Sequence, residues 1–253
     1  MPVQRKEHTP SRSHGDEPSA VHSKNGDNHL ETVAGRPRLF SGILPDDYEG
    51  ICRAARHRQF ARGEILYFEG DPVKQFFLLA SGSVKVTKLG RGGEEVILSL
   101  MTPGDVLGAV SLFSSGLCCT TAEAFRAGKA LVWEAPVFRD LMERFPVLHQ
   151  NMLVILNERL RELEDRFHEV ATNKAGTRVA LQLLRLLKSV GQPVEAGVEV
   201  SLSREELAQM TGTTLFTVSR LLSAWEARGV VRPRREAVAI CDVPSLQAIS
   251  EED

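Results

Sequence analysis

Residues 203–231, SREELAQMTGTTLFTVSRLLSAWEARGVV, hold two helical patterns on either side of one glycine. Ser203 followed by Glu206 is a capping box, which predicts that a first helix begins at Ser203. Gly212 supplies a tight turn, and the longer helix that follows is predicted to stop at Gly229. Apolar residues recur at helical spacing in both patterns, so each helix is predicted to bury one face.

The exposed side of the second helix is suited to DNA. A short helix, a glycine turn and a longer helix with hydroxyls and an arginine on its first turns is the arrangement that enters a major groove. Residues 230–240, VVRPRREAVAI, predict a two-stranded wing with arginines at its turn, where a phosphate backbone would pass. A helical hairpin that serves packing alone is the alternative. The predicted DNA-contacting residues are Arg204, Thr213, Thr214, Phe216, Thr217, Ser219, Arg220, Arg234 and Arg235.

The positive charge of the chain is local. The formal net charge is −2 over 253 residues, which gives no global signal for nucleic acid. Residues 174–242 contain ten basic and seven acidic side chains, a net charge of +3, so the rest of the chain carries −5. The basic region therefore coincides with the predicted groove-reading helix.

Short β-branched or aromatic segments, separated by glycine or proline, precede this region and are typical of an antiparallel barrel or sandwich. The glycine-rich residues 90–95 favour a hairpin over a phosphate loop, which needs a helix directly after it. A short helix is predicted from Pro45. The strand segments are EILYFEG, QFFLLASG, SVKVTKLG, EEVILSLM, TTAEAF and KALVWEA. Together with the helical C-terminal third, they predict an α+β protein.

A long helix opened by Pro146 is predicted next, and it carries a coiled-coil seam. Its apolar residues alternate between spacings of three and four, the pattern of two paired helices, with charged residues on the other faces. The barrel of the same chain could cover this face, but a barrel favours a wider and less regular apolar stripe. The seam predicts homodimerisation through Leu153, Leu156, Leu160, Leu163 and Phe167, extended by Val170.

Composition indicates the number of domains and argues against a membrane or secreted protein. Hydrophobic residues make up 42% of the chain, enough for the cores of about two domains of roughly 100 to 200 residues each. Residues 1–36 are polar and predict a disordered tail, whose irregularly spaced histidines favour solvated disorder over metal binding. No apolar run approaches the roughly 20 residues that span a bilayer, and no signal peptide is evident. The chain is therefore expected to be cytoplasmic, without a membrane partner.

The cysteines predict neither a metal site nor a disulfide framework. Cys52, Cys118, Cys119 and Cys241 form no C-x-x-C pair, and no histidine completes a zinc pattern. Reduced thiols in a reducing compartment fit this usage. No catalytic residue is predicted.

Three segments carry a resemblance to a known family: EGDPVKQFFLLASGSVKV, PGDVLGAVSLF and TVSRLLSAWEARGVV. In this order they resemble the Crp/Fnr transcription regulators, named after the cyclic-AMP receptor protein and the fumarate-nitrate-reduction regulator. The resemblance implies a homodimer that binds palindromic DNA and works with RNA polymerase. It also implies a sensory antiparallel β-roll, a double-stranded β-helix of the cyclic-nucleotide-binding kind. The expected units are a tail (1–37), the β-roll (38–145), a dimerisation helix (146–171) and a winged helix-turn-helix (172–253).

Two departures from the family bear on the effector. Cyclic-AMP binders carry Glu where Ala109 stands and an Arg-Ser pair where Cys119 and Thr120 stand, so cyclic AMP is not expected. The oxygen-sensing members hold an iron-sulfur cluster with N-terminal cysteines, and no cysteine precedes Cys52. The effector remains unknown; the apolar pocket edge would suit haem or another hydrophobic molecule, although no residue marks an axial ligand. The expected pocket residues are Gly108, Ala109, Val110, Cys119 and Thr120.

Two further hypotheses rest on a few residues each. Cys118 and Cys119 are adjacent, which suggests a thiol-based redox sensor or enzyme as the alternative function, although buried cysteines are more often small apolar fillers. The oxygen-sensing members of the family carry the motif Glu-x-x-Ser-Arg in the second helix of the helix-turn-helix, the recognition helix. Ser219 and Arg220 match this pattern, whereas Phe216 replaces the acid and would contact a thymine methyl instead of cytosine N4.

Overall fold

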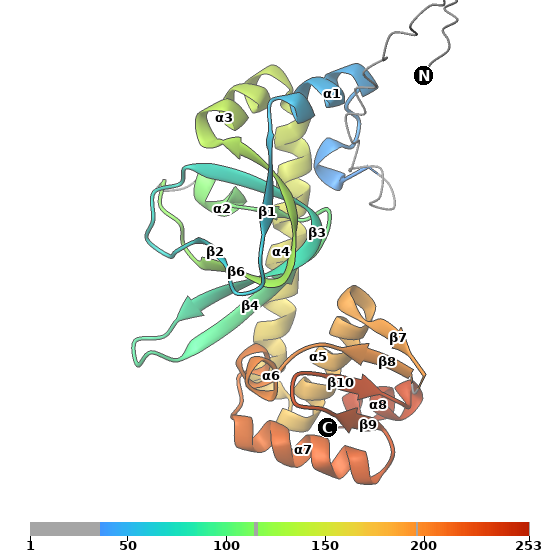
Figure 1. Ribbon diagram of the computed structural model, residues 1–253. Coiled ribbons are helices and arrows are strands. Elements are labelled where there is room, and N and C mark those ends of the chain that lie inside the picture. Colours follow the sequence, from blue (N-terminus) through green and yellow to red (C-terminus); the bar gives the residue numbers. More distant parts are fainter. Residues whose placement is uncertain (1–35, 114–115, 196, 253) are drawn as a thin grey trace, which may run out of the picture.

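The computed structural model describes residues 36–113, 116–195 and 197–252, and it shows two lobes joined by one long helix (Figure 1). The predicted disordered tail, residues 1–37, lies outside the described residues except for its last two. Among the described residues, no helix is long and apolar enough to cross a membrane.

The N-terminal lobe is built on a six-stranded antiparallel sheet, which confirms the predicted β-roll. The strand order is β1-β6-β3-β4, with β2 paired to β6 and β5 paired to β3. Residues 90–94 connect β3 to β4, so the glycine-rich segment forms a hairpin as predicted, and this hairpin extends away from the body of the lobe (Figure 1). The strands are β1 (Arg56–Phe60), β2 (Ile65–Tyr67), β3 (Gln75–Leu89), β4 (Glu95–Met101), β5 (Val106–Leu107) and β6 (Thr121–Glu134).

Two pairs of predicted strands turn out to be single long strands. QFFLLASG and SVKVTKLG form β3, and TTAEAF and KALVWEA form β6. Gly82 and Gly128 mark a close crossing of the two backbones instead of turns. An ideal Cβ on Gly82 would lie 2.5 Å from the carbonyl oxygen of Ala127, and one on Gly128 would lie 2.1 Å from that of Ser81. Only glycine allows this approach.

Short helices close one end of the roll around an aromatic core. Phe76 and Phe138 stack with ring centroids 3.8 Å apart. The buried Trp133 donates its indole N–H to the carbonyl oxygen of Ile51 at 2.9 Å, which satisfies its one polar atom. The helices are a 3-10 turn (Arg38–Phe40), α1 (Pro45–Arg53), α2 (Ala109–Leu112) and α3 (Ala135–Arg144); α2, α3 and strand β1 were not predicted.

Helix α4 (Pro146–Thr172) begins at the predicted proline and runs from the N-terminal lobe to the C-terminal lobe (Figure 1). Its N-terminal half buries Leu148, Met152 and Ile155 against the N-terminal lobe. Further along, Arg166 donates to the side-chain oxygen of Gln182, and it also contacts the carbonyl oxygen of Leu98. One face of α4 is therefore fixed to the rest of its own chain.

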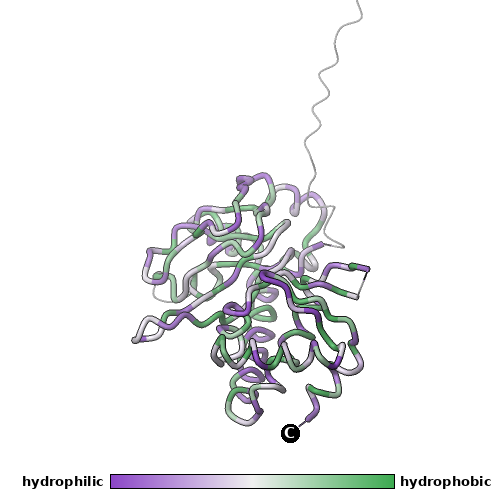
Figure 2. Tube along the Cα trace, turned by 60° about the horizontal axis from the view of Figure 1, so that its bottom comes forward, coloured by the Kyte–Doolittle hydropathy of each residue, from purple (hydrophilic) through white to green (hydrophobic). Residues whose placement is uncertain are grey.

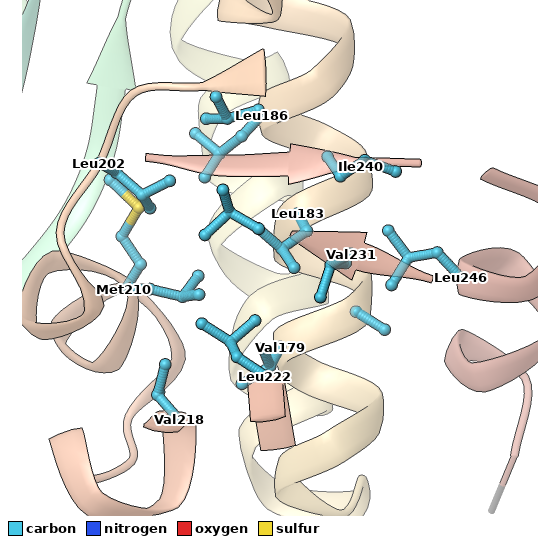
Figure 3. Packing of buried hydrophobic residues seen from close by; sticks show 14 of the residues in the cluster. Val179, Leu183, Leu186, Leu202, Met210, Val218, Leu222, Val231, Ile240 and Leu246 are labelled. Carbon is cyan, nitrogen blue, oxygen red and sulfur yellow. The ribbon is translucent and has the colours of Figure 1, made fainter. Parts of the chain in front are cut away.

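The C-terminal lobe is a helical unit with a four-stranded sheet of order β7-β8-β10-β9. The predicted wing is present as β9 and β10, and two unpredicted strands extend its sheet. Side chains from every helix of the lobe meet in one apolar core (Figure 3). The elements are α5 (Ala175–Val190), β7 (Gln192–Val194), β8 (Gly197–Val200), α6 (Arg204–Thr211), α7 (Leu215–Ala227), β9 (Val231–Pro233), β10 (Val238–Ile240) and α8 (Val243–Ser250).

The two lobes are in contact as well as connected. Ile97 of β4 and Phe125 of β6 belong to the same buried cluster as the core of the C-terminal lobe. Arg126 of β6 also donates to the carbonyl oxygen of Val190 at 3.2 Å. Apolar segments run through the interior of both lobes, whereas polar residues mark the loops at the edge (Figure 2).

Candidate nucleic-acid interface and effector pocket

The predicted helix-turn-helix is formed by α6 and α7. The capping box is present: the side chain of Ser203 accepts from the backbone N–H of Glu206 at 3.1 Å, and the Glu206 carboxylate accepts from the N–H of Ser203 at 2.7 Å. Gly212 ends α6 in the left-handed region with φ of 59°. Thr214 caps α7 by accepting from the N–H of Thr217 at 3.2 Å.

One face of α7 is buried and the other is free to contact a ligand. Val218, Leu222 and Trp225 are buried in the core of the lobe. On the opposite side, Phe216 is 79% exposed, an unusual position for a large aromatic side chain. The remaining predicted contacts lie on or beside this face: Thr214 and Arg220 are exposed, and Thr213, Thr217 and Ser219 are half-buried.

The wing arginines are not equivalent. Arg234 pairs with Glu199 of β8 at 2.9 Å, whereas Arg235 is exposed. Their neighbour Glu236 pairs with Arg62 of the N-terminal lobe at 3.0 Å, so the wing turn contacts the β-roll. A phosphate at Arg234 would compete with Glu199 in an ion pair that, at this exposure, contributes about 0–1 kcal/mol.

Arg204 lies at the first position of α6 and is half-buried. Its Nε is covered and has no hydrogen-bond partner among the described residues. The side chain is thus partly packed against its own protein, which differs from the fully exposed clamp that its position at a helix start suggests.

The predicted effector-pocket residues come together around α2. Gly108 caps this short helix with φ of 84°, and Ala109 is buried behind it. Ser111 of α2 joins the two predicted parts of the pocket, because its Oγ accepts from the backbone N–H of Cys119 at 3.3 Å. Val110 is exposed at the outer edge.

Tyr67 lies beside the expected pocket residues, a position that the sequence did not indicate. Its side chain lies close to Gly108, Thr120 and both adjacent cysteines. Burial raises the pKa of Tyr67 to about 12, with the neighbouring thiol of Cys118 as the second cause. The hydroxyl is neutral at physiological pH and can donate and accept hydrogen bonds beside these residues.

The adjacent cysteines have different environments. Cys118 is buried, and burial raises the pKa of its thiol, with Asp71 as the second cause. Cys119 is exposed, and its Sγ lies 3.6 Å from the Oγ of Ser111. A raised pKa reduces the thiolate population that thiol exchange requires. Within residues 36–113, 116–195 and 197–252, no group of three or more His, Cys, Asp or Glu residues is placed to hold a metal.

The seam predicted on α4 is an exposed apolar face. Phe167 is 77% exposed, and Leu153, Leu160, Leu163 and Val170 are exposed as well. Leu156 differs, because it is half-buried and packs against the cluster that α4 shares with the N-terminal lobe. Leu156 is therefore part of the predicted seam and also of the face of α4 that packs against the N-terminal lobe.

A polar cavity of about 470 Å³ lies between α4, the turn that joins β4 to β5, and residues 36–38. Two ion pairs line it, Arg159 with Asp105 at 3.5 Å and Arg38 with Glu158, and Arg36 and Glu162 line it as well.

Two family models match these two lobes. A model of the cyclic nucleotide-binding domain matches residues 57–145, and a model of the Crp-like helix-turn-helix domain matches residues 177–249. The chain is 30% identical to the cyclic AMP receptor protein of Thermus thermophilus, over 84% of this chain and 96% of the relative. It is 31% identical to the global nitrogen regulator of Synechococcus elongatus, over 82% of this chain and 91% of the relative.

The fold is shared with solved structures. The c-di-GMP responsive global regulator of Xanthomonas campestris superposes with a TM-score of 0.70 at 20% identity, over 77% of this chain and 98% of that one. The helix-turn-helix with its exposed face, the β-roll and the order of the two domains agree with these matches. The chain therefore belongs to the Crp/Fnr family of DNA-binding, effector-responsive transcription regulators, which are not enzymes.

Proposed function

We propose that this protein is a homodimer that reads a palindromic DNA site with helix α7 and responds to an effector other than cyclic AMP. The observation that carries the proposal is the outer face of α7, where Phe216 and Arg220 are exposed at the start of a helix whose other face is buried. Exposed side chains on the first turns of a recognition helix are the ones that reach base edges.

The exposed seam of α4 supports the dimer. An apolar stripe along a helix is stabilised by a second helix, and two parallel copies of α4 would be related by a twofold axis. Such an axis would place two α7 helices in successive major grooves, which would call for a palindromic site. RNA polymerase is the further partner that transcription regulation implies.

The residues of the interface have separate roles in this proposal. Arg220 reads guanine by donating to O6 and N7, and Phe216 contacts a thymine methyl. Thr213, Thr214, Thr217 and Ser219 supply hydroxyls near the groove, while Arg204, Arg234 and Arg235 lie toward phosphates. Because Arg204 is half-buried and Arg234 is paired with Glu199, Arg235 is the phosphate contact with the fewest competing interactions.

The expected pocket residues support an effector other than cyclic AMP. Ala109 and Cys119 offer no charged group to a ribose hydroxyl or a cyclic phosphate, and each lost charge-assisted hydrogen bond forfeits about 1.5–3 kcal/mol. The relatives respond to chemically different ligands by their names, cyclic AMP in one and c-di-GMP in another, so family membership does not fix the effector. Haem stays a hypothesis, and His57, His149 and His168, the described histidines, are all exposed.

Binding selection from random duplexes tests the DNA-reading role. We expect the wild type to select a palindrome with guanine in each half-site, with affinity that falls as salt rises. Arg220→Ala should lose about 1–3 kcal/mol on the selected site and little on random duplex, and the preference for guanine should relax. Arg235→Ala is the matched control, because Arg235 is the exposed phosphate contact with the fewest competing interactions; it should weaken all sequences alike and lower the salt slope by about one. If Arg220→Ala keeps the wild-type preference, α7 is not the reading helix.

Titration calorimetry tests the effector. Cyclic AMP should give no binding heat at micromolar concentration and should leave DNA affinity unchanged, because the charged partners of its ribose and phosphate are missing. Micromolar binding would contradict the assignment of Ala109 and Cys119. The visible spectrum and native mass of the protein purified from its host would identify a retained ligand such as haem.

A further inference from the structure

Arg178, in the first turn of α5, binds three backbone carbonyls with its three guanidinium nitrogens. Its Nε donates to the carbonyl oxygen of Thr211 at 2.9 Å, Nη1 to that of Asn173 at 2.8 Å, and Nη2 to that of Gly212 at 3.2 Å. These carbonyls belong to two separate places: Thr211 and Gly212 form the turn of the helix-turn-helix, and Asn173 caps the C-terminal end of α4.

The chemistry of helix ends explains this arrangement. The last carbonyls of a helix have no partner within it, and the C-terminal end carries a partial negative charge. The ends of α4 and α6 meet at Arg178, whose planar fork supplies donors in several fixed directions. One positive side chain thus satisfies the carbonyls of two helices and holds their ends together.

An apolar contact lies beside the same joint. An ideal Cβ on Gly212 would be 3.8 Å from Cγ2 of Val170, so the last turn of α4 reaches the turn residue of the helix-turn-helix. Val170 also continues the exposed apolar seam of α4. The face on which we place the dimer contact and the turn before the recognition helix are therefore neighbours.

We infer that Arg178 is a positioning residue for DNA recognition, which fixes the turn before α7 to the end of α4 and so sets the placement of the two recognition helices in the dimer. This inference rests on the proposed function. Three of the five N–H groups of Arg178 already bind carbonyls of its own protein, so we assign it neither to a base nor to a phosphate. Its effect is on geometry: half-site spacing depends on how rigidly α7 follows α4.

The test compares half-site spacing in Arg178→Met with the wild type. Methionine keeps much of the apolar stem and removes every donor. A panel of duplexes carries the selected half-sites at the preferred spacing and at spacings changed by one and two base pairs. We expect the wild type to bind the altered spacings at least about tenfold more weakly, and Arg178→Met to discriminate less than about threefold. Arg178→Lys, which keeps the charge on one nitrogen, should recover part of the discrimination.

Arg185→Met is the matched control. Arg185 lies on the same helix and also joins it to α4, through an ion pair with Glu169, and among the described residues no hydrogen bond or ion pair joins it to the helix-turn-helix turn. Its removal should leave spacing discrimination as in the wild type. The base preference within each half-site and the salt slope of Arg178→Met should likewise stay unchanged.

Three results would overturn the inference. A loss of one unit of salt slope would make Arg178 a phosphate contact. A lower free energy of unfolding with unchanged spacing discrimination in both Arg178→Met and Arg178→Lys would make it structural only. Equal loss of discrimination in Arg185→Met would assign the effect to α5 as a whole. Failure of the proposed function is distinct, because wild-type protein would then show no preferred spacing at all.

Discussion

The two faces of helix α4 meet different surroundings, although they alternate within each turn of one helix. Met152 is 1% exposed against the N-terminal lobe, whereas the next residue, Leu153, is 68% exposed. The first face contains apolar residues in its N-terminal half and arginines further along, at Arg159 and Arg166, which bond to the chain's own lobes. The second face is apolar over most of its length.

This difference separates the contacts that stabilise one chain from those that would pair two chains in the proposed dimer. A monomer that exposes a continuous apolar stripe places it in water at a free-energy cost that a second copy removes. The arginines on the other face do not favour pairing, since they already bond within the chain. Substitutions on the exposed face should therefore change the oligomeric state, and substitutions on the buried face should change the free energy of unfolding. Three predictions follow from this difference.

The largest effect is expected on the exposed face. Leu160→Glu with Leu163→Glu should give monomers at micromolar concentration in sedimentation velocity, because an unpaired charge buried in an interface costs about 3–5 kcal/mol. Arg161→Glu with His168→Glu places carboxylates at exposed positions outside the seam and should remain dimeric. A dimeric Leu160/Leu163 double variant would show that the stripe is not the interface.

A smaller effect is expected on the buried face. Met152→Ala should lower the free energy of unfolding by about 2–5 kcal/mol in urea, through lost burial and the cavity left behind. In the monomeric double variant, Leu153→Ala should change the same quantity by less than about 0.5 kcal/mol, because the side chain is exposed there. Equal losses at the two positions would remove the distinction between the faces.

The smallest effect is expected at the ion pair beside the polar cavity. Arg159 pairs with Asp105 at 3.5 Å, and both side chains keep some exposure. Arg159→Met should cost about 0–1 kcal/mol of unfolding free energy, with a smaller loss at high salt. A loss above about 3 kcal/mol would place this arginine with the buried contacts of Met152.

The sequence predicted the C-terminal lobe better than the β-roll for a physical reason. The capping box at Ser203, the turn at Gly212 and the stop at Gly229 are local signals, and each one is present in the structure. In the sequence, Gly82 and Gly128 resemble turn glycines between separate strands, but they are required where two distant backbones cross. A single sequence does not distinguish a glycine for a turn from a glycine for a close approach.

The other features that the sequence did not predict also depend on contacts between distant residues. Strand β1, RHRQF, buries only Phe60 fully, so it shows no apolar alternation. Tyr67 reaches the expected pocket residues because β2 lies beside β6. Arg178 bonds to backbone carbonyls, which every residue possesses, so no sequence pattern marks its partners.

The contact of Ile97 and Phe125 with the C-terminal lobe sets an energy scale for regulation. Both side chains are buried in a core that includes α6 and α7. Fully exposing a side chain of this kind costs about 1.5–3 kcal/mol, so separating the lobes costs about 3–6 kcal/mol for the pair. A ligand that moves a two-state equilibrium from 1:99 to 99:1 needs a difference in affinity of about 10⁴-fold, or about 5.5 kcal/mol, which is of the same size. An effector that drives the lobes apart must therefore bind the separated form about 10²- to 10⁴-fold more tightly merely to make the two forms equally populated.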